Sequence, residues 1–438
     1  MKNKTGHYKL KRTLGLWELC FYGIGIILGA GIYALIGVGA GIAGNAIWIS
    51  FVIGAILAAF TGLSYAELSS MYPKEAAEYN YTKKAFGRQS LSFIIGWLMA
   101  VASVIAAVTV AFGFAGYFTY LVGGSIPLVA AVFILLLSLL NYWGMKESAR
   151  FNIISTIIEM GGLIIVILVG SLFFLSSGIA IDPFETPGNL GLSAILAGTA
   201  IIFFAFLGFE DIVNVSEEAK NARKNVPKAL IIAIIVSTIL YILTSFSAVN
   251  ILGWEKLAAS KAPLSEAVGS VIPNSGFIFS LIALFATANT ALILLIVGSR
   301  ILYGMACDNA LPRKFCIISS RGTPLYSIAL VAIAGIVLSF IGDIKTVAAI
   351  TDITLFIIYF AVNASLIALR YTMPGFKRGF TVPVSIGRFP VIPFLGLLSS
   401  LFMLFYFETS IVIMEIALIA AGYIAYKIAS SISRGSKP

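Results

Sequence analysis

The chain has 438 residues, of which 60% are hydrophobic and 11% charged, and its mean hydropathy is +1.02. Soluble globular domains carry about 25% charged residues and about 45–50% apolar ones, so a soluble fold is excluded. The single histidine, His7, leaves nothing for histidine-dependent catalysis or for a haem held by two histidines. The three cysteines, Cys20, Cys307 and Cys316, match no metal or disulfide pattern, and we expect free thiols. The composition predicts an all-α polytopic membrane protein without a cofactor or a metal.

Apolar segments long enough to cross a bilayer follow one another along the whole chain. A spanning helix needs about 20 largely apolar residues. The first segment is too long for the apolar core of a signal peptide, and we expect it to be retained. We predict twelve transmembrane helices, at roughly 16–43, 46–71, 92–122, 126–143, 151–175, 192–213, 229–252, 276–304, 324–341, 345–369, 389–407 and 410–430.

The basic residues predict the orientation of these helices. With both termini on the cytoplasmic side, 26 of the 29 Lys and Arg residues fall in cytoplasmic segments, and Lys256, Lys261 and Lys345 fall outside. This distribution follows the positive-inside rule, so the net charge of +10 requires no nucleic-acid partner. We expect a multi-pass protein of the plasma membrane with no obligatory protein partner. Two short surface helices are predicted, at 74–86 inside and at 254–270 outside.

The first predicted helix contains the sequence LGAGI (28–32) in the middle of its span. Small residues such as Gly29, Ala30 and Gly31 often allow helices to pack closely in membranes. An unwound turn at the same place would have to face a protein cavity rather than lipid. We favour a broken helix at 29–31, and for Gly23 and Gly25 packing and unwinding are equally supported.

The sixth predicted helix has a corresponding feature in FFAFLGFED (203–211). Gly208 lies in mid-span, and Glu210 and Asp211 follow it directly. Acidic residues at the centre of a spanning helix cost about 2.5–3.5 kcal/mol each on insertion scales. We therefore expect both carboxyl groups to face protein or water, and a second break at this point.

The two predicted breaks are chemically complementary. The outer half of helix 1 would begin near residue 31 and offer free N–H groups, which favour a carboxylate. The outer half of helix 6 would end near Phe204 and offer free carbonyls, which favour an ammonium group. Such a site suits the backbone of an amino acid, and paired broken helices are typical of secondary transporters. The two halves have similar lengths, 15–176 and 192–370, with helices 11 and 12 at 389–430 outside this inverted repeat.

Four motifs in the same order resemble the amino acid–polyamine–organocation (APC) superfamily, specifically its prokaryotic amino acid permeases. The resemblance covers residue 14 to about residue 430. Ala76 and Ala77 stand where the family has a Gly pair, Ala222 replaces a usual Pro, and Phe206 replaces a common Tyr. The motifs are LGAGI (28–32), SYAELSSMYP (64–73) with the following AFG (85–87), FFAFLGFED (203–211) with EEAKNARKNVPKAL (217–230), and GSRILYGMACDNALP (298–312).

The resemblance implies a single transmembrane transporter domain with a LeuT-like inverted repeat of five plus five helices and an alternating-access mechanism. It implies a proton-coupled or exchange-type carrier of amino acids. By position, the backbone amides of Ala30 and Gly31 would hold the substrate carboxylate. The carbonyls of Ile27, Phe204 and Leu207 would hold its amine, and Phe204 would act as the gate on the outer side.

Several intramembrane groups are candidates for ion coupling. Glu210 follows the break in helix 6, and Glu159 occupies the helix 5 position at which some proton-coupled relatives carry a Lys. Asp352 in helix 10 either takes up a proton or recognises a cationic substrate side chain. Buried carboxyl groups can exchange protons near neutral pH, which makes the proton our preferred coupling ion. Sodium is left open, because Thr287 and Thr290 lie three residues apart on one helix face.

The pocket for the substrate side chain is expected between helix 3 and helix 8. The predicted lining is small or apolar, which favours several neutral amino acids because such a pocket discriminates poorly between side chains that differ by a methylene. Asp352 is the feature that would instead favour a basic substrate. The predicted lining residues are Met99, Ala100, Ser103, Val104 and Ala107 of helix 3 and Leu294 of helix 8.

The sequence thus predicts a secondary active transporter for proton-coupled uptake of neutral amino acids with broad specificity, and not an enzyme. An amino acid exchanger and an amine or polyamine carrier are the alternatives within the same class. A channel or a non-transporting amino acid sensor on the same fold is the alternative from another class. A channel would need polar residues along a whole path, whereas here they cluster at the two predicted breaks.

Overall fold

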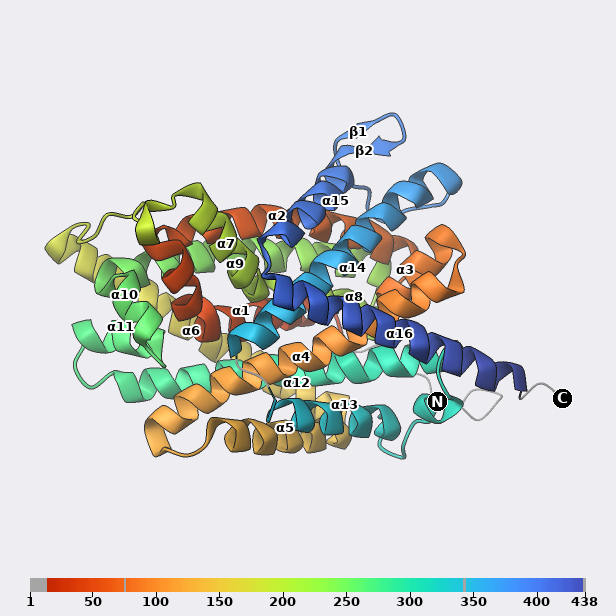
Figure 1. Ribbon diagram of the computed structural model, residues 1–438, viewed down its shortest axis with the longest axis horizontal. Coiled ribbons are helices and arrows are strands. Elements are labelled where there is room, and N and C mark those ends of the chain that lie inside the picture. The colour runs from red at the N-terminus through yellow and green to blue at the C-terminus, as the bar shows by residue number, and fades with distance from the viewer. Residues whose placement is uncertain (1–13, 75, 342–343, 436–438) are drawn as a thin grey trace.

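The computed structural model describes residues 14–74, 76–341 and 344–435, and these are almost entirely helical (Figure 1). The long helices run roughly along the long axis of the molecule. They are α1 Leu16–Ala43, α2 Ile47–Met71, α4 Gln89–Val122, α5 Ile126–Trp143, α6 Met145–Ser177, α9 Ala222–Leu252, α12 Gly276–Cys307, α14 Ile344–Thr372 and α16 Thr409–Gly435.

Shorter elements connect and cover the long helices. The α-helices among them are α3 Ala77–Phe86, α7 Leu192–Ile202, α8 Asp211–Asn214, α10 Trp254–Ala259, α11 Pro263–Val271, α13 Leu325–Leu338 and α15 Val391–Met403. Short 3-10 turns are η1 Gly44–Ala46, η2 Pro187–Asn189, η3 Phe203–Phe206, η4 Ser216–Glu218, η5 Arg313–Cys316 and η6 Leu404–Tyr406. A two-residue hairpin pairs β1 Ser385–Ile386 antiparallel with β2 Phe389–Pro390, with Ile386 opposite Phe389.

Ten helical segments of the described chain are long and apolar enough to cross a membrane. The other two predicted spans, 324–341 and 389–407, correspond to α13 and to α15 with η6, which are shorter apolar helices. At about 1.5 Å per residue, the 14 residues of α13 fall short of a hydrocarbon core about 30 Å thick. The multi-pass membrane architecture is confirmed, and ten of the twelve spans meet the length and composition that a crossing requires.

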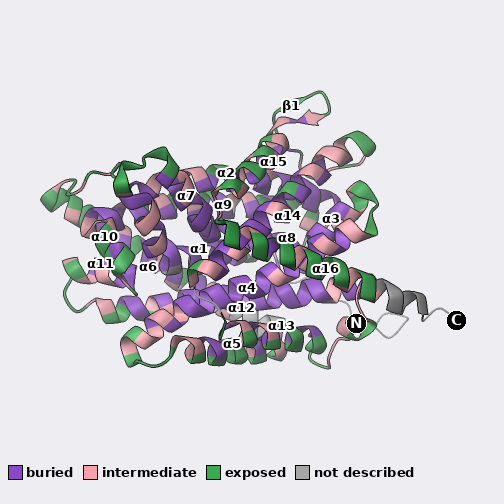
Figure 2. Ribbon diagram, in the orientation of Figure 1, coloured by how far each residue is buried: buried purple, intermediate pink, exposed green. Residues whose placement is uncertain are grey.

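The distribution of buried residues fits a helical bundle in lipid. Figure 2 shows α4 and α12 buried over most of their length, whereas α5 and α16 carry long exposed strips. Exposed side chains on α5 are large and apolar, for example Leu136 and Leu139. The most extensively packed pairs of long helices are α4 with α12 and α2 with α9. Helix α1 packs against both α9 and α12 and so joins these pairs into one bundle.

The sixth predicted span is interrupted, as the sequence indicates. Helix α7 ends at Ile202, the chain continues through η3, and Leu207 takes an extended conformation with ψ 146°. Gly208 follows with φ +103°, a value that L side chains rarely adopt, and α8 begins at Asp211. The break therefore lies where the FFAFLGFED sequence places its glycine.

The predicted break in helix 1 is wrong for this structure, because α1 is one continuous helix of 28 residues. Its glycines serve close packing instead. A Cβ at Gly31 would lie 2.0 Å from Ala205 Cα, and one at Gly29 would lie 2.0 Å from Thr290 Oγ1. Small residues here let η3 and α12 approach the α1 backbone, which is the packing alternative that the sequence left open.

The two predicted surface helices are present. The inner segment 74–86 corresponds to α3, and the outer segment 254–270 corresponds to α10 and α11. Residues in left-handed conformations bound α3 at both ends, Ala76 with φ 48° and Gly87 with φ 64°. Ala76 is one of the two alanines that replace the family's Gly pair.

The expectation of three free thiols is wrong for two of them. A disulfide joins Cys307 at the end of α12 to Cys316 at the end of η5, with the Cα atoms 5.1 Å apart. The chain turns back between them through a nine-residue separation, which spacing alone did not indicate. Cys20 is a free, buried cysteine.

Candidate substrate and coupling site

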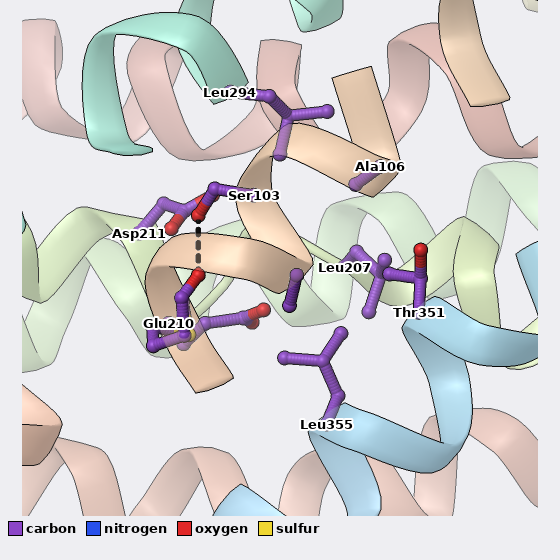
Figure 3. A pocket seen from close by; sticks show the side chains of 10 residues that line it. Ser103, Ala106, Leu207, Glu210, Asp211, Leu294, Thr351 and Leu355 are labelled. Carbon is purple, nitrogen blue, oxygen red and sulfur yellow. Dashed lines mark hydrogen bonds between the residues drawn. The ribbon is translucent and has the colours of Figure 1, made fainter. Parts of the chain in front are cut away.

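A narrow cavity lies beside the interruption of helix 6, and its volume of about 10 Å³ has room for about one water molecule. Figure 3 shows Glu210 and Asp211 on one side of it and Thr351 and Leu355 on the other, with Leu207 between them. Sites for drug-sized ligands have roughly 300–1,000 Å³, so a substrate can enter here only when the walls of the cavity move apart. Its lining residues are Met99, Ala102, Ser103, Ala106, Leu207, Glu210, Asp211, Leu294, Thr351 and Leu355.

Five of the residues predicted for the site line this cavity. Met99 and Ser103 come from α4, Leu294 from α12, and Leu207 and Glu210 from the interruption. The structure thus brings helix 3, helix 6 and helix 8 of the predicted order together at one place. Their roles in binding stay predictions.

The face of α4 that lines the cavity differs from the predicted one. Ala102 and Ala106 take the places for which Ala100, Val104 and Ala107 were predicted. All five alanine and valine side chains are buried, so burial does not separate the two sets. They differ in which side of α4 faces the cavity. Ser103 donates its hydroxyl to the Met99 carbonyl at 2.9 Å, within its own helix.

The backbone carbonyls near the interruption are partly engaged by a tyrosine. The Tyr241 hydroxyl of α9 lies 2.7 Å from the Ala205 carbonyl and also contacts the Ile27 carbonyl of α1. The Phe204 carbonyl accepts the Leu207 N–H at 3.2 Å. Tyr241 therefore fixes η3 against α1, and the predicted amine ligands Ile27 and Phe204 both have a protein donor.

The predicted amide ligands on helix 1 are in a regular helix. Within an α-helix each N–H bonds to the carbonyl four residues earlier. Because α1 continues through Ala30 and Gly31, their amides are not free to hold a carboxylate in this conformation. Gly31 instead allows η3 to approach closely.

Two carboxyl groups follow the interruption and are almost fully buried. The exposed fractions of Glu210 and Asp211 are 2% and 1%. Glu210 Oε2 accepts the Gly208 N–H at 3.2 Å, so the carboxylate closes the turn made by the glycine. The Tyr359 side chain of α14 faces Glu210. Asp211 Oδ1 has no hydrogen-bond partner in the described part of the chain.

Asp352 is also buried, with its carboxyl group towards the Phe204 backbone. Neither carboxylate oxygen has a hydrogen-bond partner of standard geometry among residues 14–74, 76–341 and 344–435. Phe204 itself is 3% exposed and is not one of the residues that line the cavity. Asp352 therefore lies beside η3, and it directly follows the cavity residue Thr351 in the chain.

Glu159 lies apart from Glu210, against α1 and α12. Its side chain faces Asn289, and its main-chain carbonyl accepts the Tyr33 hydroxyl at 3.0 Å. Both carboxylate oxygens are buried without a standard hydrogen-bond partner in the described chain. The helix 5 position that carries a Lys in some relatives is thus an acid enclosed by polar and aromatic side chains.

The two threonines predicted as sodium ligands point in different directions. The Thr290 hydroxyl reaches the carbonyls of Gly25 and Ile26 at 3.5 Å, whereas the Thr287 hydroxyl bonds to Ala283 in its own helix at 2.8 Å. The predicted contact with helix 1 carbonyls is present for Thr290 alone.

A buried ion pair fixes the inner end of α2. The carboxylate of Glu67, which is 0% exposed, lies 2.6 Å from Arg370 Nη2 and 2.8 Å from Arg378 Nε. It also accepts the Val382 N–H at 2.8 Å. This geometry gives Glu67 a structural role in joining α2 to the end of α14.

Sequence reasoning missed three contributors to this region. Thr351 and Leu355 line the cavity from α14, and Tyr241 bridges α1 and η3 from α9. Thr351 and Leu355 are four residues apart and lie on one helix face. Asp352, an acid in the same apolar segment, was the sequence signal that could have identified this helix turn. No local signal distinguishes Tyr241 from the other tyrosines.

The chain is similar in sequence to known transport proteins. The branched-chain amino acid permease BcaP of Bacillus subtilis is 29% identical over 91% of this chain and 89% of its own length. The methylthioribose transporter of the same bacterium is 31% identical over 88% of this chain and 86% of its own. The vacuolar cationic amino acid transporter 4 of Arabidopsis thaliana is 29% identical over 84% of this chain and 65% of its own.

A family model confirms the relationship over most of the chain. The model described as "Amino acid permease" matches residues 14–422. This range includes the interrupted helix 6, the cavity and the buried carboxyl groups. The chain therefore belongs to the amino acid permease family of the APC superfamily.

Proposed function

We propose that the protein is a secondary active transporter that takes up neutral amino acids with broad specificity, driven by protons, through alternating access. The observation that carries this proposal is the cavity at the helix 6 interruption. Its lining is apolar except for Ser103, Glu210, Asp211 and Thr351. An apolar pocket separates side chains that differ by one methylene only about 10- to 200-fold, which favours several neutral substrates.

The substrate amine is assigned to the carbonyl side of the interruption, at Leu207. Leu207 lies outside both helical halves, whereas the carbonyls of Gly208 and Glu210 accept the N–H groups of Asp211 and Val213. We therefore assign the amine to the Leu207 carbonyl. Met99, Ser103 and Leu294 then contact the substrate side chain. Glu210, buried at the same interruption, is the proposed proton carrier, because a buried carboxyl without a charged partner favours its neutral form.

The wider architecture is part of the same proposal. Helices α13 and α15 complete twelve spans, 15–176 and 192–370 form the inverted repeat, and 389–430 adds two helices. Both termini lie in the cytoplasm and the protein resides in the plasma membrane. The excess of Lys and Arg on that side supports this orientation.

Uptake into proteoliposomes tests the proposal. Labelled neutral amino acids are supplied without sodium, with and without an inward proton gradient. Accumulation that requires the gradient supports the proton symporter, uptake that requires internal amino acid makes the protein an exchanger, and binding without uptake makes it a sensor. Loss of gradient dependence in Glu210→Gln, but not in Glu255→Gln on the exposed surface of α10, supports Glu210 as the carrier.

A cationic substrate is the second candidate, and Asp352 is the observation that favours it. Its buried carboxylate has no ion-pair partner within the described residues, and a cationic side chain would supply one. Competition of lysine against leucine for uptake separates the two substrates. Stronger competition by lysine that disappears in Asp352→Asn would replace the neutral substrate in our proposal by a basic one.

A further inference from the structure

Glu78 is a buried acid that the proposed transport site does not use. It belongs to α3, which lies outside the membrane-spanning helices, at the end predicted to be cytoplasmic. Its exposed fraction is 1%, although α3 is a short polar helix with Lys83 and Lys84 in its last turn. A surface helix needs no buried carboxyl group for its own stability, and acids of this kind are almost never fully buried unless paired.

The partners of Glu78 come from the inner half of helix 6. Glu78 Oε1 accepts the Asn214 side-chain amide at 3.5 Å, and the oxygen of that amide accepts the Ala77 N–H at 3.0 Å. Asn214 therefore connects α3 to α8, three residues after Asp211. Among the described residues Glu78 forms no ion pair, so its charge has no compensating cation.

Two tyrosines occupy the space between Glu78 and Glu210. The Tyr65 side chain of α2 faces Glu78, and the Tyr359 side chain of α14 faces Glu210. The two tyrosine rings contact each other edge to face, with centroids 6.1 Å apart. Two buried phenols in ring contact therefore lie next to the acid at the cavity and the acid of α3.

Several polar atoms along this line lack a standard hydrogen-bond partner. They are the hydroxyl oxygens of Tyr65 and Tyr359 and the Oε2 atom of Glu78, within the part of the chain described. A buried polar atom without a partner is destabilising, so a water molecule that bridges these atoms would be bound favourably. A hydroxyl both donates and accepts, which is the property that a proton relay requires.

We propose that Glu78 is a second proton-carrying residue, which exchanges the proton of Glu210 with the cytoplasmic side through Tyr359 and Tyr65. The step conserves charge and atoms. Glu210 gives its proton to the Tyr359 oxygen as that hydroxyl passes its own proton towards Tyr65, and Tyr65 in turn passes one to the Glu78 carboxylate. Glu210 is left ionised and Glu78 neutral, and Glu78 then releases the proton to cytoplasmic water.

The surroundings of Glu78 are consistent with this role. The titratable groups that act on it are Tyr65 from α2, Tyr81 from its own helix, and Glu210 and Asp211 from helix 6. None of them carries a positive charge, and the ionised form of Glu78 is favoured only by hydrogen-bond donors, which are its own backbone N–H, Tyr65 and Asn214. Burial raises the pKa of Glu78 to about 7, which is where a group that loads and releases protons in the cytoplasm works best.

The inference rests on the proposed proton-coupled function, and one experiment separates the two. Reconstituted wild type, Glu78→Gln and Tyr65→Phe are compared in two modes: accumulation driven by a proton gradient, and exchange of labelled for unlabelled substrate at equal pH. Both substitutions preserve shape, and Tyr65→Phe keeps the aromatic contacts. Glu255→Gln in exposed α10 is the matched control, because it removes an acid of the same kind far from the relay.

We expect gradient-driven accumulation to fall at least about tenfold in Glu78→Gln and in Tyr65→Phe, since relays by acids and bases contribute about 10²–10⁴ in rate. Exchange, which needs no net proton release, falls far less. Glu255→Gln matches the wild type in both modes.

Gradient-driven accumulation that persists in Glu78→Gln overturns the inference while leaving the proposed function intact. Equal loss of both modes in folded Glu78→Gln overturns it as well, because a structural role alone accounts for that result. Absence of gradient dependence in the wild type overturns the proposed function, and the relay with it.

Discussion

Gly208 lies directly against Ile26 of α1, so that a Cβ built on Gly208 would come within 2.6 Å of Ile26 Cγ1. The φ of Gly208 is +103°, so a side chain at this position would be strained even without the contact. The interruption of helix 6 therefore depends on glycine for two independent reasons. Space and backbone conformation both exclude a larger residue where the cavity begins.

Gly208→Ala is expected to destabilise the protein by about 2–4 kcal/mol and to lower uptake at least tenfold, from backbone strain and from overpacking against Ile26. Thermal unfolding in detergent and uptake by proteoliposomes measure the two effects. Gly161→Ala in α6 is the control, because a Cβ there meets nothing within 4 Å. A Gly208→Ala protein with the melting temperature and uptake of the wild type would show that the interruption tolerates a side chain.

Glu67→Gln is expected to lower the free energy of unfolding by about 3–5 kcal/mol, because it leaves two arginines beside a neutral partner in a buried site. Both Arg370 and Arg378 approach Glu67 within 2.8 Å. Glu408→Gln is the comparison, since the Lys345–Glu408 pair is exposed and worth under about 1 kcal/mol. Equal losses in the two variants, measured by chemical denaturation in detergent, would contradict the structural role of Glu67.

Ala76→Gly is expected to stabilise the protein, by up to about 1 kcal/mol. Ala76 has φ 48° and ψ 54°, a left-handed conformation that costs an L residue about 1–2 kcal/mol. Glycine removes that strain. It also raises the conformational entropy of the unfolded chain, which offsets about 0.5–1 kcal/mol of the gain. Gly87→Ala, at φ 64° with open space around it, is the reverse case and should destabilise. The two melting temperatures should move in opposite directions.

Glu78 is expected to make stability depend on pH around neutrality. Its pKa is about 7 in the folded protein against an ordinary value of 4.5, so the folded state binds the proton more tightly. The contribution of Glu78 to the free energy of unfolding is therefore greatest below pH 4.5. It falls as the pH rises through 7, by about 3 kcal/mol in total. Unfolding of wild type and Glu78→Gln is compared between pH 5 and 8. A difference between them that stays constant over this range would exclude the shifted pKa.

Much of the helical framework follows from the sequence alone, because spanning helices must be long and apolar. The predicted range 126–143 and α5 coincide, and 46–71 differs from α2 by one residue. The interruption of helix 6 was also predictable, since Gly208 and two acids in mid-span exclude a continuous helix facing lipid.

The site was predicted only in part, because its remaining features arise from tertiary packing. Gly29 and Gly31 are compatible with an unwound turn and with a close helix contact. In the structure they contact Thr290 and Ala205, which are distant in sequence, and so serve the close contact. Ala102 of α4 lines the cavity and Ala100 does not. The rotation of α4 about its own axis decides this, and the periodicity of apolar residues does not predict that rotation. The bridging position of Tyr241 depends on how α9 packs against α1.

The walls of the cavity come from segments that lie far apart in the sequence. Leu207, Glu210 and Asp211 continue the chain of α7, whereas the other lining residues belong to α4, α12 and α14. A molecule enclosed there is released only when whole helices slide or tilt, because rotation of one side chain does not separate the walls. Collective motions of this kind take microseconds to milliseconds. On the proposed function, we therefore expect turnover to be no faster than these motions of whole helices.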